Sequence, residues 1–320
     1  MALRTSEAPE RFGRIGVLMG GSSTERDISL KSGKAVYEAL VRLGLDVVAI
    51  DVRTEDVEEN IRLIKSKNID CAFLALHGRF GEDGQMQEIL DALGLPYTGS
   101  GVLASRLAMD KIASRKILEV YGLPVPRYKE IHRCSFTPEY RILPNLRLPL
   151  VVKPATHGSS IGISFVDNME GLPEALEMAF RFDERVIVEE YIKGKELTAG
   201  ILDNEVLPII EIVPKRRFFD YKAKYQSGIT DYIVPARLPE EVTKKVKDIA
   251  LRVHKLLGCF GCSRIDMILA PDNTPFVLEL NSIPGLTPVS LLPKAAKTVG
   301  IEFEQLCLKL IELAYKRAQG

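Results

Sequence analysis

The sequence predicts a chain of α/β and α+β domains that opens with a parallel α/β domain. Three observations support this fold class. Strand and helix patterns alternate through the first hundred residues, as they do in parallel sheets. Two neighbouring strand patterns then enclose a loop rich in glycine and serine, and after Lys193 strand patterns follow one another as hairpins. A chain of 320 residues with 46% hydrophobic content favours two or three domains over one.

The opening domain is expected to hold three parallel strands. Strand patterns cover residues 14–19, 45–52 and 71–76. A helical pattern covers residues 28–43, and a second helical stretch ends at Lys67. The apolar residues of the first helix fall on one face, which is the stripe that a helix needs to cover a sheet.

The middle of the chain predicts a smaller α+β unit. A helical pattern covers residues 103–121. Strand patterns at residues 150–153 and 163–166 enclose the glycine- and serine-rich loop, and a helix at residues 170–180 and a strand at residues 186–192 follow. The loop is therefore a tight connection between adjacent strands.

Hairpin patterns dominate the last third of the sequence. Residues 197–202 pair with residues 206–213, and a helix at residues 240–257 precedes a second hairpin. Between them lies an irregular stretch, residues 214–236, with five aromatic and five basic residues. Long irregular stretches in compact domains are usually functional or disordered, and disorder depletes aromatics. We therefore expect an ordered loop that lies over a site.

The charge balance excludes some partners. Lys+Arg and Asp+Glu both number 43, so no overall field would gather nucleic acid or an anionic membrane. The sequence contains no signal-peptide pattern and no apolar stretch of bilayer-spanning length, so we expect a cytoplasmic protein without membrane partners. Five scattered cysteines favour reduced thiols. Cys259 and Cys262 form a C-x-x-C without a second pair, which favours two buried thiols over zinc.

The second hairpin carries the strongest physical signal for a site. Its strands cover residues 263–269 and 275–281, and turn residues cluster between them. A turn in the middle of this connection places Asp266 opposite Glu279. The polar face of the hairpin then holds Arg264, Asp266, Glu279 and Asn281, and the apolar face holds Ile265, Met267, Leu269, Phe276, Leu278 and Leu280.

Two opposed carboxylates are the reason to expect a metal at this hairpin. Asp266 opposite Glu279 places two negative charges about 5 Å apart, which is destabilising unless a cation or a proton lies between them. The amide oxygen of Asn281 adds a third hard donor of the kind that Mg²⁺ prefers. Arg264 on the same face would bind oxyanions, so these donors indicate phosphoryl transfer. The alternative is an amphipathic hairpin whose polar face only meets water.

A nucleotide-binding region is predicted upstream. Lys153 ends an apolar strand pattern, where a charge needs a partner, and a nucleotide phosphate would supply one. The amides of the loop at residues 154–162 would cradle phosphate, although the same pattern also fits an ordinary turn. The next strand ends at Glu189, in a segment that reads as an interdomain linker. Such linkers bind adenine through backbone groups and a carboxylate, and the alternative is a charged linker without a ligand.

Taken in order, these residues resemble the ATP-grasp ligases, and most specifically the D-alanine–D-alanine ligase family. The resemblance runs from about Arg14 to Leu313. It implies a three-domain ATP-grasp architecture: a Rossmann-like domain at residues 1–99, a small central domain at 100–192, and a C-terminal domain at 193–320 with the lid and the metal site. The motifs that carry it lie at residues 20–26, 76–84, 96–101, 220–225 and 281–287.

In this family ATP phosphorylates one D-alanine, and the amine of a second attacks the acyl phosphate, for peptidoglycan precursor synthesis. The resemblance implies ATP and two Mg²⁺ ions as cofactors, with Mn²⁺ as a substitute, and leaves a homodimer open. It assigns the metal to Asp266, Glu279 and Asn281. It assigns ATP binding to Lys111, Lys153, Ser159, Ser160, Glu189, Tyr191, Ile192, Glu196 and Lys224, of which Lys224 would also hold the transferring phosphoryl group.

The resemblance also assigns the amino-acid site. Arg264 and the backbone N–H of Gly285 would hold the developing oxyanion. Glu25 would bind the ammonium of the first D-alanine, and His77 would lie near its carboxylate. Ser290 and the N–H of Leu291 would take the carboxylate of the second D-alanine. The catalytic set is Glu25, Ser159, Tyr225, Arg264 and Gly285, since in the family Glu25 links through Ser159 to Tyr225 and ties the lid to the first domain.

Three of these residues have simpler interpretations. Glu25 would close a capping box with Ser22 if the first helix began that early. His77 would be a core histidine, and Lys111 alone would be a solvated surface lysine. The chain departs from the family at Glu190, where many members carry lysine, and at residues 288–289 in the second-substrate pocket.

Three rival functions stay open at this stage. A ligase with D-lactate or D-serine as second substrate is the first, and Tyr225 argues against it because those relatives usually lack the lid tyrosine. A nucleotide-binding module without catalysis is the second. A dinucleotide dehydrogenase is the third, but residues 20–23 lack the G-x-G-x-x-G pattern.

Overall fold

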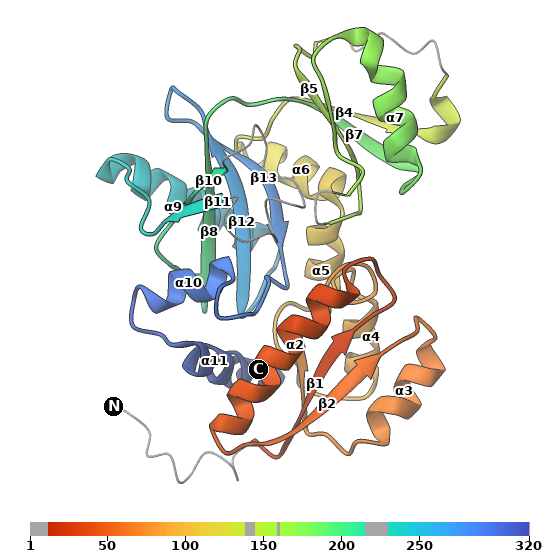
Figure 1. Ribbon diagram of the computed structural model, residues 1–320, viewed down its shortest axis with the longest axis vertical. Helices are drawn as coiled ribbons and strands as arrows, with labels where there is room; N and C mark the ends of the chain where they lie inside the picture. Colours follow the sequence, from red (N-terminus) through yellow and green to blue (C-terminus); the bar gives the residue numbers. More distant parts are fainter. Residues whose placement is uncertain (1–11, 138–144, 159–160, 215–229, 320) are drawn as a thin grey trace.

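Three sheets organise the chain in the computed structural model, which describes residues 12–137, 145–158, 161–214 and 230–319 (Figure 1). The first is parallel and three-stranded, the second is antiparallel and four-stranded, and the third is antiparallel and six-stranded. This arrangement confirms the predicted mixture of α/β and α+β, with the parallel sheet at the N-terminal end.

The parallel sheet has the order β2-β1-β3. Its elements are β1 (Arg14–Gly20), α2 (Arg26–Arg42), β2 (Asp46–Val52), α3 (Val57–Lys65), β3 (Cys71–Leu74) and α4 (Gln85–Ala92). β1 is buried after its first residue, and α2 buries Val36, Ala39 and Leu40 in one stripe, as the apolar spacing predicts. The predicted alternation of strand and helix is confirmed.

A break at Asp110 divides the helix predicted at residues 103–121. The segment forms α5 (Val102–Met109) and α6 (Lys111–Val120). Asp110 has a ψ of 97°, and its carboxylate accepts hydrogen bonds of 3.0 Å from two amides in the first turn of α6. An aspartate at this position satisfies amides that a new helix leaves unpaired, so the prediction of one continuous helix was wrong. Lys111 consequently stands at the start of α6.

The four-stranded sheet has the order β4-β7-β5-β6. Its elements are β4 (Tyr128–His132), η1 (Arg133–Ser135), β5 (Leu150–Pro154), β6 (Ser164–Val166), η2 (Met169–Gly171), α7 (Leu172–Phe180) and β7 (Arg185–Glu190). The strands and the helix predicted between residues 150 and 192 are confirmed to within a few residues, whereas β4 was not predicted. β5 and β6 are antiparallel neighbours on either side of the predicted phosphate loop.

The six-stranded sheet has the order β11-β10-β8-β12-β13, with β9 beside β8. The elements are β8 (Lys195–Leu202), β9 (Glu205–Val206), β10 (Ile210–Pro214), β11 (Thr230–Ile233), α9 (Glu240–Leu256), β12 (Cys262–Leu269), β13 (Pro275–Asn281), α10 (Leu291–Lys297) and α11 (Phe303–Ala318). β11 corrects the expectation that residues 214–236 are irregular throughout. It forms because it pairs with β10, a long-range contact that a local pattern does not reveal.

The register of the second hairpin agrees with the prediction at its polar end. Asp266 on β12 lies opposite Glu279 on β13, and Arg264 lies opposite Asn281. β12 also pairs with β8 along its whole length, so the hairpin is held in the middle of the sheet. The four polar side chains therefore occupy one face of a fixed platform.

A β-bulge reverses the face of β13 beyond this point. Met267 pairs with Val277, so Leu278 is the extra residue. Val277 is 2% exposed, whereas Phe276 and Leu278 are only half-buried. The prediction that Phe276 and Leu278 share the core face was therefore wrong. The N–H of Val277 donates to the carbonyl of Pro124 at 2.8 Å, a contact with a distant segment that accompanies the bulge.

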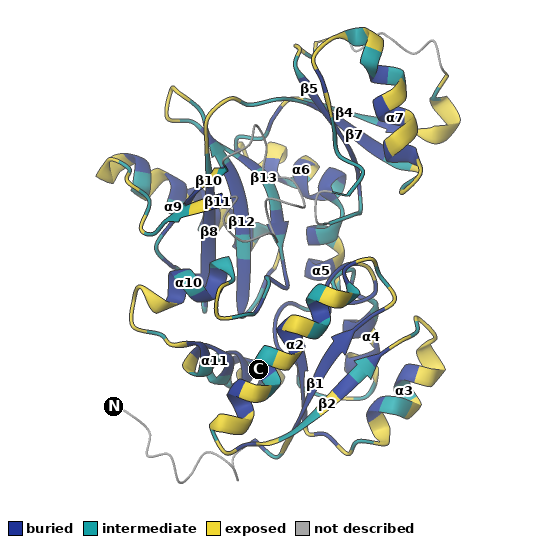
Figure 2. Ribbon diagram, viewed as in Figure 1, coloured by how far each residue is buried: buried dark blue, intermediate teal, exposed yellow. Residues whose placement is uncertain are grey.

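The C-terminal helix returns to the N-terminal sheet. α11 lies beside α2 (Figure 1), and apolar residues of both helices and of β1 and β3 share one buried cluster. Arg42 on α2 contacts Glu304 on α11 at 2.8 Å. Figure 2 shows β1, β8 and β12 mostly buried and the outer surfaces of α2, α3 and α9 exposed. The N-terminal α/β unit and the C-terminal helix thus share one core, which packs the parallel sheet against the six-stranded sheet.

Candidate active site

A cavity of about 560 Å³ joins the N-terminal sheet to the six-stranded sheet. It is bordered by the start of α2, the loop after β3, the polar face of the β12–β13 hairpin and the segment before α10. Of the predicted site residues, seven line it: Glu25, His77, Arg264, Asn281, Gly285, Ser290 and Leu291. Residues from distant parts of the sequence thus meet at one place, as a site requires.

Asp266 is held in place by Arg264 and Asn281 on the hairpin and by Thr198 on the neighbouring strand β8. Arg264 donates to its carboxylate twice, from Nε at 2.9 Å and from Nη2 at 2.7 Å. The hydroxyl of Thr198 donates at 2.6 Å, and the amide of Asn281 donates at 3.2 Å. Because Arg264 and Asp266 are two residues apart on one strand, they share a face and form this two-bond ion pair.

The donor set on this face suits Mg²⁺. Asp266 and Glu279 are paired across the strands, with Asn281 two residues along. Lys111 lies 3.8 Å from the carboxylate of Glu279 and offsets part of its charge. No group of three His, Cys, Asp or Glu gathers in the part of the chain that the structure describes. Two carboxylates and one amide leave coordination positions for water and phosphate oxygens, as Mg²⁺ sites for nucleotides do.

Lys111 is not the surface lysine that its isolated position in the sequence suggested. Its side chain is 7% exposed, and Nζ donates to the carbonyl of His157 in the phosphate loop at 2.6 Å. Lys111 therefore connects this loop to Glu279 of the hairpin. A cation that touches both features is well placed to bind phosphate between them.

Lys153 and Glu189 form a buried ion pair. Lys153 Nζ lies 2.8 Å from one carboxylate oxygen of Glu189, and Arg115 pairs with the other. Burial lowers the pKa of Lys153 to about 8, against the opposing effect of Glu189. The sequence predicted Lys153 and Glu189 as parts of one nucleotide site, and the structure brings them together. Arg115 was not predicted, because nothing in a local pattern marks it.

The linker between β7 and β8 carries the other predicted nucleotide residues. The N–H of Tyr191 donates to the carbonyl of Pro149 at 2.9 Å, and its ring meets Phe165 edge-on, with 6.1 Å between centroids. Ile192 follows in the linker, and Glu196 is the second residue of β8. These three residues are half-buried, and the cavity beside Glu25 does not include them.

Glu25 precedes α2 and faces the cavity. It is the N-cap residue of α2, makes no side-chain cap hydrogen bond and is 7% exposed. Ser22 instead donates to Glu55 at 2.6 Å, so the capping-box alternative is wrong. A side-chain carbon added to Gly158 would lie 3.0 Å from the carboxylate of Glu25. The phosphate loop of the four-stranded sheet thus comes close to Glu25, which lies beside the parallel sheet.

His77 is a neutral histidine at the wall of the cavity. It is 5% exposed, and its Nε2 lies 2.9 Å from the hydroxyl of Ser32 on α2. Burial lowers its pKa to about 4, so at neutral pH the ring is uncharged. Its interaction with a substrate carboxylate would therefore be a hydrogen bond rather than an ion pair.

The segment before α10 supplies the remaining predicted groups. Ser290 exchanges a hydrogen bond of 2.8 Å with the hydroxyl of Thr287 and accepts from the Thr287 amide at 3.1 Å. A side-chain carbon on Gly285 would lie 3.3 Å from the Ser290 hydroxyl, so glycine permits this close approach. Leu291 begins α10. The turn thus places Gly285, Ser290 and Leu291 together at the cavity.

Glu82 is a cavity residue that the sequence did not single out. Its carboxylate accepts from the amide of Gly78 at 2.6 Å, and Glu25 approaches the same glycine. Burial, followed by the charge of Glu25, raises the pKa of Glu82 to about 8. Lys31 and Tyr232 also line the cavity without having been predicted. Their positions follow from helix and sheet packing, whereas the motif around Glu82 was a signal that could have identified it.

Glu82 should make the stability of the ligand-free protein depend on pH. The folded pKa of about 8 exceeds the ordinary value of 4.5, so between these pH values the folded state keeps a proton that the unfolded chain has lost. Stability therefore falls as pH rises through this window. Glu82→Gln should flatten the dependence and melt a few degrees above wild type at pH 9. Melting curves from pH 5 to 9 test this, with exposed Glu88→Gln as control. Parallel curves for Glu82→Gln and wild type would refute it.

Four predicted site residues lie outside the described part of the chain. They are Ser159, Ser160, Lys224 and Tyr225. Gly158, the described residue before the first two of them, lines the cavity, and the carbonyl of His157 accepts from Lys111.

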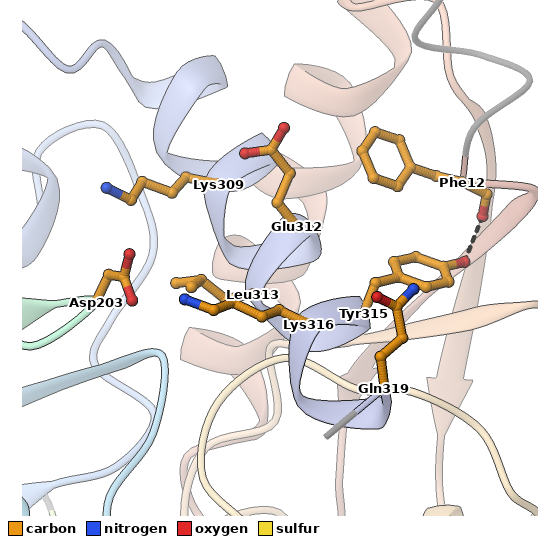
Figure 3. Close-up of a pocket in the computed structure, with 8 residues that line it drawn as sticks. All are labelled: Phe12, Asp203, Lys309, Glu312, Leu313, Tyr315, Lys316 and Gln319. Atoms are coloured by element: carbon orange, nitrogen blue, oxygen red, sulfur yellow. Dashed lines mark hydrogen bonds between the residues drawn. The ribbon is translucent and has the colours of Figure 1, made fainter.

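A second hollow lies on the other side of the C-terminal helix. Figure 3 shows it among side chains of α11, with the hydroxyl of Tyr315 donating to the carbonyl of Phe12. Lys309, Lys316 and Asp203 border it, and none of the predicted site residues does. Of the described helices, none has the length and apolar character needed to cross a membrane.

Fold and site together define an ATP-grasp ligase. The chain matches the model of the D-ala D-ala ligase C-terminus over residues 117–312 and that of the N-terminus over residues 52–100. It is 49% identical to the D-alanine–D-alanine ligase of Pelotomaculum thermopropionicum, over 94% of this chain and 96% of the relative. The chain belongs to the D-alanine–D-alanine ligase family.

Solved structures agree with this assignment. D-alanine–D-alanine ligase from Bacillus anthracis complexed with ATP superposes with a TM-score of 0.85 at 36% identity, over 96% of this chain and 99% of that one. The VanG D-Ala:D-Ser ligase from Enterococcus faecalis superposes with a TM-score of 0.80 at 34% identity, over 95% and 100%. The dehydrogenase alternative has no support from these comparisons.

Proposed function

We propose that the chain joins two D-alanines with ATP to give D-alanyl-D-alanine, ADP and phosphate, a step in peptidoglycan precursor synthesis. The observation that carries the proposal is that Glu25 lines one cavity with Arg264, on the hairpin that also bears Asp266 and Glu279. Ammonium, oxyanion and metal sites are then adjacent, as carboxylate activation followed by amine attack requires.

ATP would lie between the four-stranded and six-stranded sheets. The buried Lys153–Glu189 pair and the approach of Lys111 to the phosphate loop support this position. Ser159, Ser160, Tyr191, Ile192, Glu196 and Lys224 complete the proposed nucleotide set. Two Mg²⁺ ions, or Mn²⁺ in their place, would be held by Asp266, Glu279 and Asn281, and when bound they neutralise charge on the phosphates.

The chemistry would proceed in two steps. A carboxylate oxygen of the first D-alanine attacks the γ-phosphorus of ATP, and ADP leaves. The second amine, having lost a proton, attacks the carbonyl carbon and forms the C–N bond. The tetrahedral oxyanion then collapses, the C=O bond re-forms, and phosphate departs. Glu25 would orient the first ammonium and His77 would lie near that substrate's carboxylate. Arg264 and the N–H of Gly285 would stabilise the oxyanion, and Ser290 and Leu291 would bind the second carboxylate.

The domain limits stay as proposed at residues 1–99, 100–192 and 193–320. The three sheets fall within these ranges and support them, while α11 packs back on the first domain. Tyr225 and Ser159 would join Glu25 in linking the lid to the first domain. Whether two chains associate is a separate question that gel filtration addresses.

Measuring ADP release with different second substrates tests the proposed function. D-alanine should give the fastest ADP release, with one dipeptide formed for each ADP. L-alanine and D-lactate should give no ADP release above background. D-serine differs by one hydroxyl, and an apolar pocket rejects such an isostere by only about 100-fold, so slow release is expected. Release that is independent of D-alanine would contradict the proposal.

A preference for D-serine is the second candidate function. The similarity to the VanG D-Ala:D-Ser ligase is the observation that favours it. In the same assay, a higher kcat/KM for D-serine than for D-alanine as second substrate would establish this candidate in place of the first.

A further inference from the structure

Arg115 is a fully buried arginine outside the predicted sites. It lies on α6, is 1% exposed, and pairs with Glu189 on β7. Its Nη2 also donates to the carbonyl of Leu278 on β13 at 3.2 Å. The guanidinium lies over the ring of Tyr128, 5.5 Å from its centroid. One side chain therefore connects a helix with strands of two different sheets.

Burying a guanidinium costs free energy, which a side chain whose only role is to fill space would not need to spend. Its Nε and Nη1 atoms are buried and have no hydrogen-bond partner within the described residues. Each buried donor without a partner destabilises the fold, and an apolar side chain of similar volume would avoid that cost. The contacts that Arg115 does make consequently point to a role other than packing.

The bulge in β13 brings the carbonyl of Leu278 within reach of Arg115. Leu278 is the extra residue of the bulge and immediately precedes Glu279. The atom that Arg115 holds is thus one residue from a proposed metal ligand. At its other contact, Arg115 holds Glu189, which also pairs with Lys153 at the proposed nucleotide site.

We propose that Arg115 is a positioning residue that fixes the nucleotide carboxylate Glu189 relative to the metal carboxylate Glu279. The inference rests on the proposed function, because it takes these two carboxylates to bind opposite ends of one ATP–magnesium unit. Arg115 touches neither substrate nor metal. Both contacts run from Nη2, which lies one atom further along the side chain than the ammonium of lysine, so a lysine at this position would not reach both groups at once.

The matched variants are Arg115→Met and Arg115→Lys, with Arg252→Met as control. Arg252 also donates through Nη2 to a backbone carbonyl at 3.1 Å, that of Tyr121 at the other end of α6, but it is half-exposed and far from Glu189. Arg115→Met should raise the KM for ATP and the Mg²⁺ concentration for half-maximal rate by about tenfold each, as expected for losing a charged hydrogen bond. The KM for D-alanine should stay within twofold.

Arg115→Lys should recover part of the ATP effect, because it keeps a cation beside Glu189, but not the magnesium effect. Arg252→Met should match wild type in all constants. The proposal is overturned if Arg115→Met, folded by circular dichroism, keeps both constants within twofold, or if all three constants rise together with the loss of melting temperature. If Arg115→Met does not fold, Arg115→Lys decides, and wild-type magnesium dependence in that variant would overturn the proposal.

Calorimetric ATP binding separates this inference from the proposed function. If the wild type binds ATP–magnesium but forms no dipeptide, the proposed function fails, while a tenfold weaker affinity of Arg115→Met still supports the positioning role. Equal affinities of the wild type and Arg115→Met would reject the positioning role even in an active ligase.

Discussion

Arg264→Met should lower kcat for dipeptide formation by about 100- to 1,000-fold, the usual cost of removing one oxyanion donor. Arg264 lines the cavity, and its two bonds to Asp266 fix its guanidinium in place. In the proposed mechanism this cation faces the negative charge that develops on the oxygen of the tetrahedral intermediate. Methionine fills similar volume without that charge.

The same substitution also removes the partner of Asp266. The freed carboxylate would still keep Thr198 and Asn281 as donors, so folding should survive. Dipeptide and ADP are measured separately at saturating substrates, with Arg252→Met as control. A folded Arg264→Met enzyme with more than a tenth of wild-type kcat would show that Arg264 is not the oxyanion donor.

Glu279→Gln should raise the Mg²⁺ concentration for half-maximal activity by more than tenfold and depress turnover at saturating metal. The amide keeps the shape of the carboxylate but removes the negative charge opposite Asp266 that a divalent cation would share. Loss of outer-shell partners alone costs about 10–100-fold in metal affinity or activity, so loss of a ligand should cost no less.

The magnesium titration of Glu279→Gln is compared with that of Glu88→Gln, an exposed glutamate on α4 that pairs with Arg106. Glu88→Gln should follow the wild-type curve. A Glu279→Gln curve that superposes on the wild type would remove Glu279 from the metal site, whatever its effect on the maximal rate.

The opposition of Asp266 and Glu279 was predicted from a register that the structure keeps only at the polar end of the hairpin. From the turn to Met267 the residues pair one position away from that register, and the bulge at Leu278 restores the opposition. The bulge at Leu278 could not be predicted, because it accompanies a hydrogen bond from the N–H of Val277 to the carbonyl of the distant Pro124. Local patterns thus predicted which residues share the polar face of the hairpin, but not all the residues of its core face.

Other differences between prediction and structure have similar causes. The break at Asp110 was visible in principle, since aspartate before a helical pattern is a capping signal. β11 and Arg115 were not, because each is defined by partners far away in sequence. Glu82 becomes a site residue only when the loop after β3 folds against Glu25. Glu82 lay within the motif at residues 76–84 and could have been singled out, whereas Arg115 is placed by packing alone and was missed.

Isotope transfer tests the proposed acyl phosphate most directly. D-alanine with ¹⁸O in both carboxylate oxygens is incubated with ATP, Mg²⁺ and the enzyme, and the phosphate is analysed by mass spectrometry. The attacking carboxylate oxygen leaves with phosphorus, so each dipeptide formed should be matched by one inorganic phosphate carrying one ¹⁸O. Dipeptide accompanied by unlabelled phosphate, or by label in AMP, would contradict the mechanism.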